Sequence, residues 1–119
     1  MSLKKVWNQF LDKYMKSPAE KIDNVVFSVD EVKRYRIIFS GIVQGVGFRY
    51  ETWAIAQKLG LVGFVQNEPD GTVYAEVQGP ENKILYLLDC LQKIPRIHIE
   101  KVEMYEIEQK TERSFEFGN

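Results

Sequence analysis

The chain has 119 residues, of which 45% are hydrophobic and 28% are charged, and its formal net charge is −1. This length and composition fit a single globular domain, and the absence of a long apolar run excludes a transmembrane helix. Residues 33–67 contain five basic residues and a single acidic one, whereas acidic residues outnumber basic ones beyond residue 67. A small anion is therefore a more plausible ligand than a long nucleic acid.

Cysteine usage and the N-terminus indicate where the protein resides. Cys90 is the only cysteine, so no disulfide can form within the chain. Its position in an apolar helical repeat is typical of a buried structural thiol. Polar residues interrupt any signal-peptide core near the N-terminus. We therefore expect a cytoplasmic protein in a reducing compartment.

Residues 1–31 are predicted to be an N-terminal helical extension of a domain that spans residues 32–119. Ser17-Pro18-Ala19-Glu20 has the capping-box pattern that ends one helix and begins another. The apolar stripe of the first helix, residues 3–16, can pack on the domain itself, form a homodimer, or contact a membrane or partner. The chain is thus predicted to be a monomer or a homodimer through this stripe: Trp7, Phe10, Leu11, Tyr14 and Met15.

The first half of the domain alternates strand and helix patterns. Residues 35–39 have the period of a strand that runs into a glycine-rich turn at 41–47. Residues 48–59 repeat at helical spacing, and Gly60 is placed to end that helix. Residues 61–66 and 73–77 are predicted to be strands joined by a turn at 68–71.

The second half repeats the pattern. Gly79-Pro80 opens a helix that continues to about Gln92, and residues 99–108 are predicted to form a charged edge strand. Phe115 and Phe117 are expected in a last short strand. This order predicts an α+β fold, the ferredoxin-like split βαβ (βαββαβ) sandwich. Two helices then cover one face of a four-stranded antiparallel sheet.

The glycine-rich turn Gly41-Ile42-Val43-Gln44-Gly45-Val46-Gly47-Phe48-Arg49 suggests an oxyanion site. A strand-to-helix turn directs backbone N–H groups at one point, and Arg49 adds a fixed positive charge there. A cation at this end of a helix is unfavourable by a few tenths of a kcal/mol unless an anion binds. The alternative is a tight connection in which Arg49 is a surface residue that pairs with Glu51 or another acid.

The stretch Gly63-Phe64-Val65-Gln66-Asn67 places an amide side chain at a strand end, where it can hold a water molecule. Asparagine before a turn often bonds its own backbone instead. Here Glu68-Pro69-Asp70-Gly71 already has the residues of a turn, which leaves the Asn67 side chain available. An anion site beside a water-binding amide suggests hydrolysis of a phosphate compound.

Together, these two stretches and the following Glu68-Pro69-Asp70-Gly71-Thr72-Val73 and Gly79 resemble the paired signature of the acylphosphatase family. The resemblance covers about residues 33–119. It implies a hydrolase that cleaves the carboxyl–phosphate bond of acyl phosphates to a carboxylate and inorganic phosphate, with no metal or other cofactor. It also implies that Arg49 binds the phosphate and that Asn67 orients the attacking water. The phosphate cradle would be completed by the N–H groups of Gln44, Gly45, Val46, Gly47, Phe48 and Arg49.

The C-terminal residues depart from the family pattern. Many members finish with a basic and an aromatic residue, whereas this chain finishes with Phe115-Glu116-Phe117-Gly118-Asn119. On that ground a contact between the C-terminus and Arg49 is not expected.

Two other classes of function compete with the enzyme. A non-catalytic anion-binding or regulatory module would keep the turn, although the presence of both Arg49 and Asn67 favours catalysis. An RNA-binding module of the same fold class would place its motif on a central strand with stacking aromatics, whereas residues 45–50 are predicted in a turn. His98 is interpreted as a surface residue.

Overall fold

The computed structural model describes residues 19, 22 and 25–119, and all of its helices and strands lie in residues 32–117. The predicted helix over residues 3–16 lies outside the described residues, as does most of the predicted capping box. The domain boundary after residue 31 therefore stays a prediction. The elements in chain order are β1 (Val32–Ile42), α2 (Phe48–Leu59), β2 (Val62–Asn67), β3 (Val73–Pro80), α3 (Glu81–Gln92), β4 (His98–Ile107) and β5 (Phe115–Phe117).

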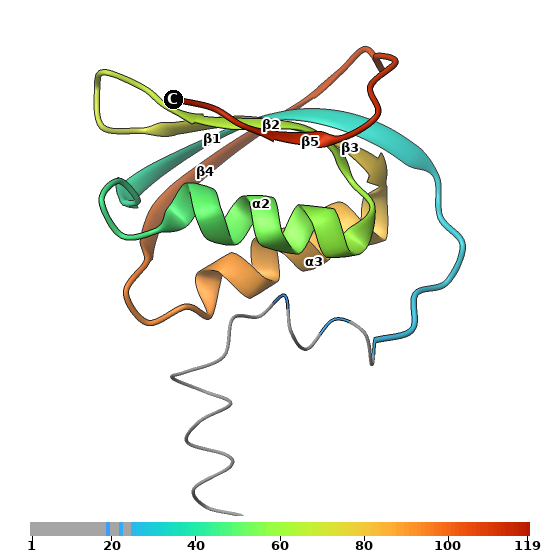
Figure 1. Cartoon of the computed structure of the whole chain (residues 1–119), viewed down its shortest axis with the longest axis horizontal. Coiled ribbons are helices and arrows are strands. Elements are labelled where there is room, and N and C mark those ends of the chain that lie inside the picture. The colour runs from blue at the N-terminus through green and yellow to red at the C-terminus, as the bar shows by residue number, and fades with distance from the viewer. Residues whose placement is uncertain (1–18, 20–21, 23–24) are drawn as a thin grey trace, which may run out of the picture.

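The strands form one sheet in the order β4-β1-β3-β2-β5, and both helices cover the same face of it (Figure 1). The pairs β1–β3, β1–β4 and β2–β3 are antiparallel, so the predicted four-stranded antiparallel sheet and its ferredoxin-like order are confirmed. The short β5 adds a fifth strand, which pairs with β2 in parallel. β4 lies at the edge of the sheet, as its charged sequence predicts.

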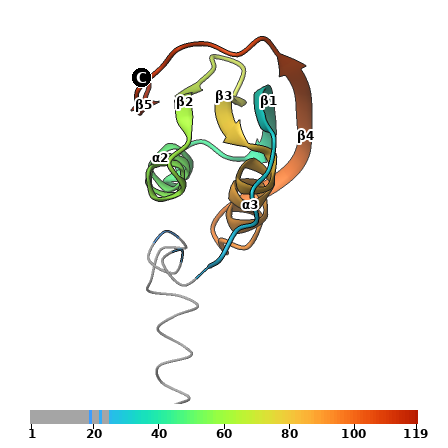
Figure 2. The ribbon, with the colours of Figure 1, turned by 90° about the vertical axis from the view of Figure 1, so that its right-hand side faces the viewer.

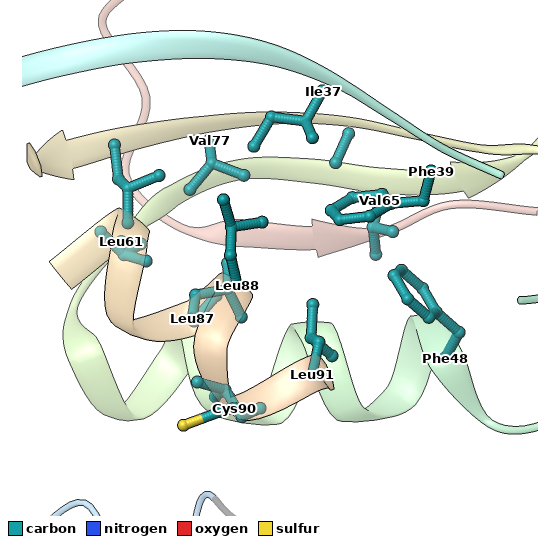
Figure 3. Packing of buried hydrophobic residues seen from close by; sticks show 14 of the residues in the cluster. Ile37, Phe39, Phe48, Leu61, Val65, Val77, Leu87, Leu88, Cys90 and Leu91 are labelled. Carbon is teal, nitrogen blue, oxygen red and sulfur yellow. The ribbon is translucent and has the colours of Figure 1, made fainter. Parts of the chain in front are cut away.

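The hydrophobic core lies between the sheet and the two helices. Ile37 and Phe39 of β1 are almost fully buried, and the Phe39 ring lies 4.8 Å from that of Phe48 at the start of α2. Figure 3 shows these side chains with Val65 and Leu91 between the layers. The period-2 pattern of the strands and the helical spacing of α2 therefore face each other across one apolar layer. This packing fixes the first turn of α2 against the sheet.

A long connection covers part of the other face of the sheet. The chain between β4 and β5 crosses this helix-free face, as Figure 2 shows. There the Gln78 side chain donates to the carbonyl of Lys110 and accepts from its N–H, each at 2.8 Å. Arg34 lies in the basic stretch that we expected to attract an anion. In the structure it is only 1% exposed and is paired with Glu76 and Glu112. The attraction expected from that basic region therefore does not include Arg34.

Three of the described residues before β1 pack against the rest of the domain, whereas residues 28–31 are exposed. Ala19 and Ile22 are buried in the core, and the Phe27 ring meets that of Tyr86 edge-on at 5.2 Å.

In the part of the chain that the structure describes, no helix is both long and apolar enough to cross a membrane.

Candidate active site

The turn between β1 and α2 takes its shape from two glycines with positive φ. Gly45 has φ 73° and Gly47 has φ 78°, both in the left-handed region that residues with a side chain rarely adopt. Gly47 also precedes α2, and its carbonyl accepts the first helical hydrogen bond from the N–H of Glu51 at 3.0 Å. The turn thus passes directly into the helix N-terminus.

The backbone N–H groups of this turn are available to a ligand. Among the described residues, none of the N–H groups from Gln44 to Arg49 donates to a protein acceptor. The first N–H groups of any helix have no partner within the helix, which makes such an end a site for anions. Gly45 and Gly47 are exposed to solvent, so an anion can reach the turn.

The side chain of Gln44 ties this turn to the turn between β2 and β3. Its Nε2 donates to the carbonyls of Glu68 and Thr72, each at 2.8 Å. The second turn is itself closed by Asp70, whose Oδ1 accepts from the N–H and the hydroxyl of Thr72. These bonds stabilise the charged form and lower the pKa of Asp70. The sequence predicted a role only for the backbone of Gln44.

Arg49 is half-buried on the first turn of α2. Its Nη1 donates to the carbonyl of Gly118 at 2.9 Å, and its Cζ lies 5.1 Å from the centre of the Phe117 ring. A guanidinium has five N–H donors, so most of them are left for a ligand. The alternative pairing of Arg49 with Glu51 is not found, because Glu51 pairs with Arg96 at 2.9 Å.

Asn67 is the last residue of β2. Its backbone N–H donates to Asn119 Oδ1 at 3.0 Å, and its carbonyl accepts from Asn119 Nδ2 at 3.3 Å. Its side-chain Oδ1 is buried and has no hydrogen-bond partner within the described residues. A buried polar oxygen left in this state is unfavourable unless a water or ligand donates to it. The turn after Asn67 does not use this oxygen.

Residues 117–119 bring Arg49 and Asn67 to the same place. Phe117 and Gly118 contact Arg49, and Asn119 contacts Asn67. Figure 1 shows the end of the chain, the β1–α2 turn and the β2–β3 turn at the same end of the molecule. The expectation that the C-terminal residues do not touch Arg49 is therefore wrong. The parallel pairing of β5 with β2 carries Gly118 back to the site despite the unusual sequence.

One further residue of the site lies outside the predicted motifs. Arg96, in the loop after α3, donates from Nε to the carbonyl of Val46 at 2.7 Å. No local pattern distinguishes an arginine in a helix-to-strand loop, so only the folded arrangement places it here. Two other predictions are confirmed, since Cys90 is buried and His98 is exposed at the surface.

Comparison with known proteins identifies the family. The family model described as Acylphosphatase matches residues 35–117. The acylphosphatase of Ligilactobacillus salivarius is 43% identical over 86 residues, an alignment that covers 71% of this chain and 96% of that protein. The chain belongs to the acylphosphatase family. It is an acylphosphatase, an enzyme whose substrates are small-molecule acyl phosphates.

Solved structures of acylphosphatases have the same fold as this chain. The acylphosphatase from Bacillus subtilis superposes with a TM-score of 0.63 at 34% identity, covering 74% of this chain and 97% of that chain. A structure titled as full-length HypF in the phosphate- and nucleotide-bound form superposes with a TM-score of 0.68 at 33% identity. In that case the match covers 77% of this chain but 12% of HypF. An acylphosphatase-like fold thus also occurs as a small part of a larger protein.

Proposed function

We propose that this acylphosphatase holds the phosphoryl group with the N–H groups of Gln44 to Arg49 and the Arg49 guanidinium, while Asn67 orients the attacking water. The observation that carries the proposal is the meeting of Arg49 and Asn67 at residues 117–119, beside a turn whose N–H groups have no protein acceptor among the described residues.

The reaction requires little from the protein beyond positioning and charge stabilisation. Water oxygen attacks phosphorus while the bond from phosphorus to the carboxyl oxygen breaks. The leaving carboxylate is a weak base, with a pKa of about 4 for its acid, so it departs without a proton donor. The loose transition state spreads negative charge over the phosphoryl oxygens, where preorganised N–H donors and a guanidinium stabilise it. We therefore propose that no metal ion is needed.

Asn67 is suited to hold the water because its amide both donates and accepts hydrogen bonds. The buried, unpartnered Oδ1 can accept from a water proton and so direct a lone pair of the water oxygen toward phosphorus. Asn119 bonds the N–H and the carbonyl of Asn67, on the two sides of its Cα, which restricts the direction of this side chain.

A steady-state assay with benzoyl phosphate tests the proposal on the full chain. We expect turnover in the presence of a metal chelator, with inorganic phosphate as a competitive inhibitor because it occupies the same cradle. Phosphate binding without turnover would favour the non-catalytic anion-binding module. Turnover that stops on chelation would contradict the metal-free mechanism.

A further inference from the structure

Arg96 joins the β1–α2 turn to the α2 helix behind the predicted phosphate cradle. Its Nε donates to the Val46 carbonyl at 2.7 Å and its Nη2 donates to Glu51 Oε1 at 2.9 Å. The Glu51 side chain is 7% exposed, whereas that of Arg96 is 53% exposed. The same guanidinium thus donates both to a nearly buried carboxylate and to the carbonyl of the turn.

The bond to Val46 determines which way the next N–H group points. The peptide between Val46 and Gly47 is trans, because the described chain has no cis peptide. In a planar trans peptide the carbonyl and the N–H point in opposite directions. Since Arg96 holds the Val46 carbonyl on its own side, the Gly47 N–H is directed away from Arg96. The bond from the Glu51 N–H to the Gly47 carbonyl orients the Phe48 N–H in the same manner.

Glycine at position 47 fits this arrangement for a second reason. A Cβ built on Gly47 would lie 3.2 Å from Arg96 Nη2, closer than an ordinary contact. The turn and the guanidinium are therefore packed against each other through Gly47. Because Glu51 balances the charge of Arg96, the geometry points to orientation of the turn as the role of Arg96, more than attraction of an anion.

We propose that Arg96 is a positioning residue that presets the Gly47 N–H for the phosphoryl group. This inference rests on the proposed function, because it assigns a role within the same cradle. Arg96 does not touch the reacting atoms in this arrangement. Its effect reaches the substrate through the Val46–Gly47 peptide.

The test measures inorganic phosphate binding to the full chain by NMR, following the Gly47 amide, together with KM and kcat for benzoyl phosphate. We expect Arg96→Ala to raise the Kd for phosphate and the KM by about tenfold, the effect of roughly one charge-assisted hydrogen bond. Arg96→Lys, which can reach one acceptor but not span both, should fall between Arg96→Ala and the wild type. Arg113→Ala is the matched control, because it removes the same charge from an exposed position near β5.

The outcomes separate this role from a purely structural one. If Arg96 only tied the loop after α3 to α2, its removal would lower the free energy of unfolding while the folded protein kept its phosphate affinity. A phosphate Kd within twofold of the wild type in both Arg96 variants overturns the inference. If those variants bind normally while Arg49→Ala loses binding, the proposed function survives. If the wild type itself binds no phosphate, both are wrong.

Discussion

Arg49 places a positive charge at the N-terminus of α2, which is the positive end of the helix dipole. Its contacts within the protein use a small part of its hydrogen-bonding capacity. We expect Arg49→Ala to lower kcat/KM for benzoyl phosphate by about a thousandfold, because the proposed bidentate contact to the phosphoryl group would be lost. Phosphate binding should weaken in parallel. Steady-state kinetics and a phosphate titration check both effects.

Arg49→Lys separates charge from geometry at the same position. A lysine keeps the positive charge but cannot bind two phosphoryl oxygens in one plane, so most of the loss should remain. Lys58→Ala, at the other end of the same helix, is the control for removal of a positive charge from α2. Full activity of the lysine variant would mean that a point charge suffices.

Asn67 is predicted to act on water and not on phosphate. Asn67→Ala should therefore fold normally and bind inorganic phosphate within about twofold of the wild type, while kcat falls by roughly a hundredfold or more. The same phosphate titration and benzoyl phosphate assay measure the two quantities. Turnover close to that of the wild type would refute the water-orienting role.

Some of these site residues could be predicted from the sequence alone, and others could not. Arg49 and Asn67 could be proposed as site residues because Arg49 follows a glycine-rich strand-to-helix turn and Asn67 stands between a strand pattern and a turn pattern, where local chemistry is informative. Arg96 and Asn119 could not, because their partners lie 50 and 52 residues away along the chain. The Arg34 pairing with Glu76 escaped prediction for the same reason, since the residues are 42 apart.

At the scale of the element, α2 and α3 begin in different ways. Gly47 leaves the first N–H groups of α2 available, whereas those of α3 are occupied by residues before β1. Pro80 stands at the N-cap of α3 and makes no side-chain hydrogen bond there. The Asp30 carboxylate instead accepts from the N–H of Asn82 at 2.9 Å, and the Glu31 carbonyl accepts from that of Glu81. This difference supports the proposal of an anion site at the start of α2, where the N–H groups are left open.

Asp30 acts as a remote cap, so Asp30→Ala should lower the free energy of unfolding by about 1 kcal/mol. Asp30→Asn keeps an acceptor oxygen and should lose less. Urea denaturation measures both, and benzoyl phosphate turnover should not change because α3 does not contribute to the site. An alanine variant as stable as the wild type would show that solvent replaces the carboxylate.

The elements were predictable to the extent that their patterns are local. The apolar spacing of residues 48–59 and the alternation of residues 73–77 match the buried faces of α2 and β3. The parallel pairing of β5 was not predictable, because three residues carry no signal for the strand they will join. Its register, Gly63 opposite Phe115, follows from the route of the long connection across the sheet.

On the scale of the whole molecule, charged side chains join both central strands to the β4–β5 connection. Arg34 of β1 lies 2.8 Å from Glu76 of β3 and also pairs with Glu112. Lys110 approaches Glu76 at 3.1 Å. A buried arginine is tolerated only when such partners compensate its charge. Because Glu112 and Lys110 belong to the β4–β5 connection, the same ion pairs also attach this connection to the sheet and so help to position β5.

This cluster predicts how stability changes in acid. Burial favours the neutral form of Glu76, but hydrogen bonds from Arg34, Tyr74 and Lys110 outweigh it and lower the pKa of Glu76 below its ordinary value of 4.5. A carboxyl group with a lowered pKa in the folded state contributes stability that is complete above the unfolded pKa. That contribution is lost as the pH falls through the folded pKa. The free energy of unfolding should therefore decrease below about pH 4.5, as Glu76 becomes protonated.

Glu76→Gln isolates this contribution. At neutral pH the variant should lose about 3 kcal/mol of unfolding free energy, because Arg34 stays buried with fewer charged partners. Between about pH 5 and pH 3 its stability should fall less steeply than that of the wild type, since the titrating group is gone. Urea denaturation across this range measures both effects, and Glu108→Gln is the control because that carboxylate is exposed. If Glu76→Gln and the wild type lose stability in parallel, the acid sensitivity lies in other carboxylates. Glu81 is one such group, because hydrogen bonds from Lys33 and Tyr35 lower its pKa.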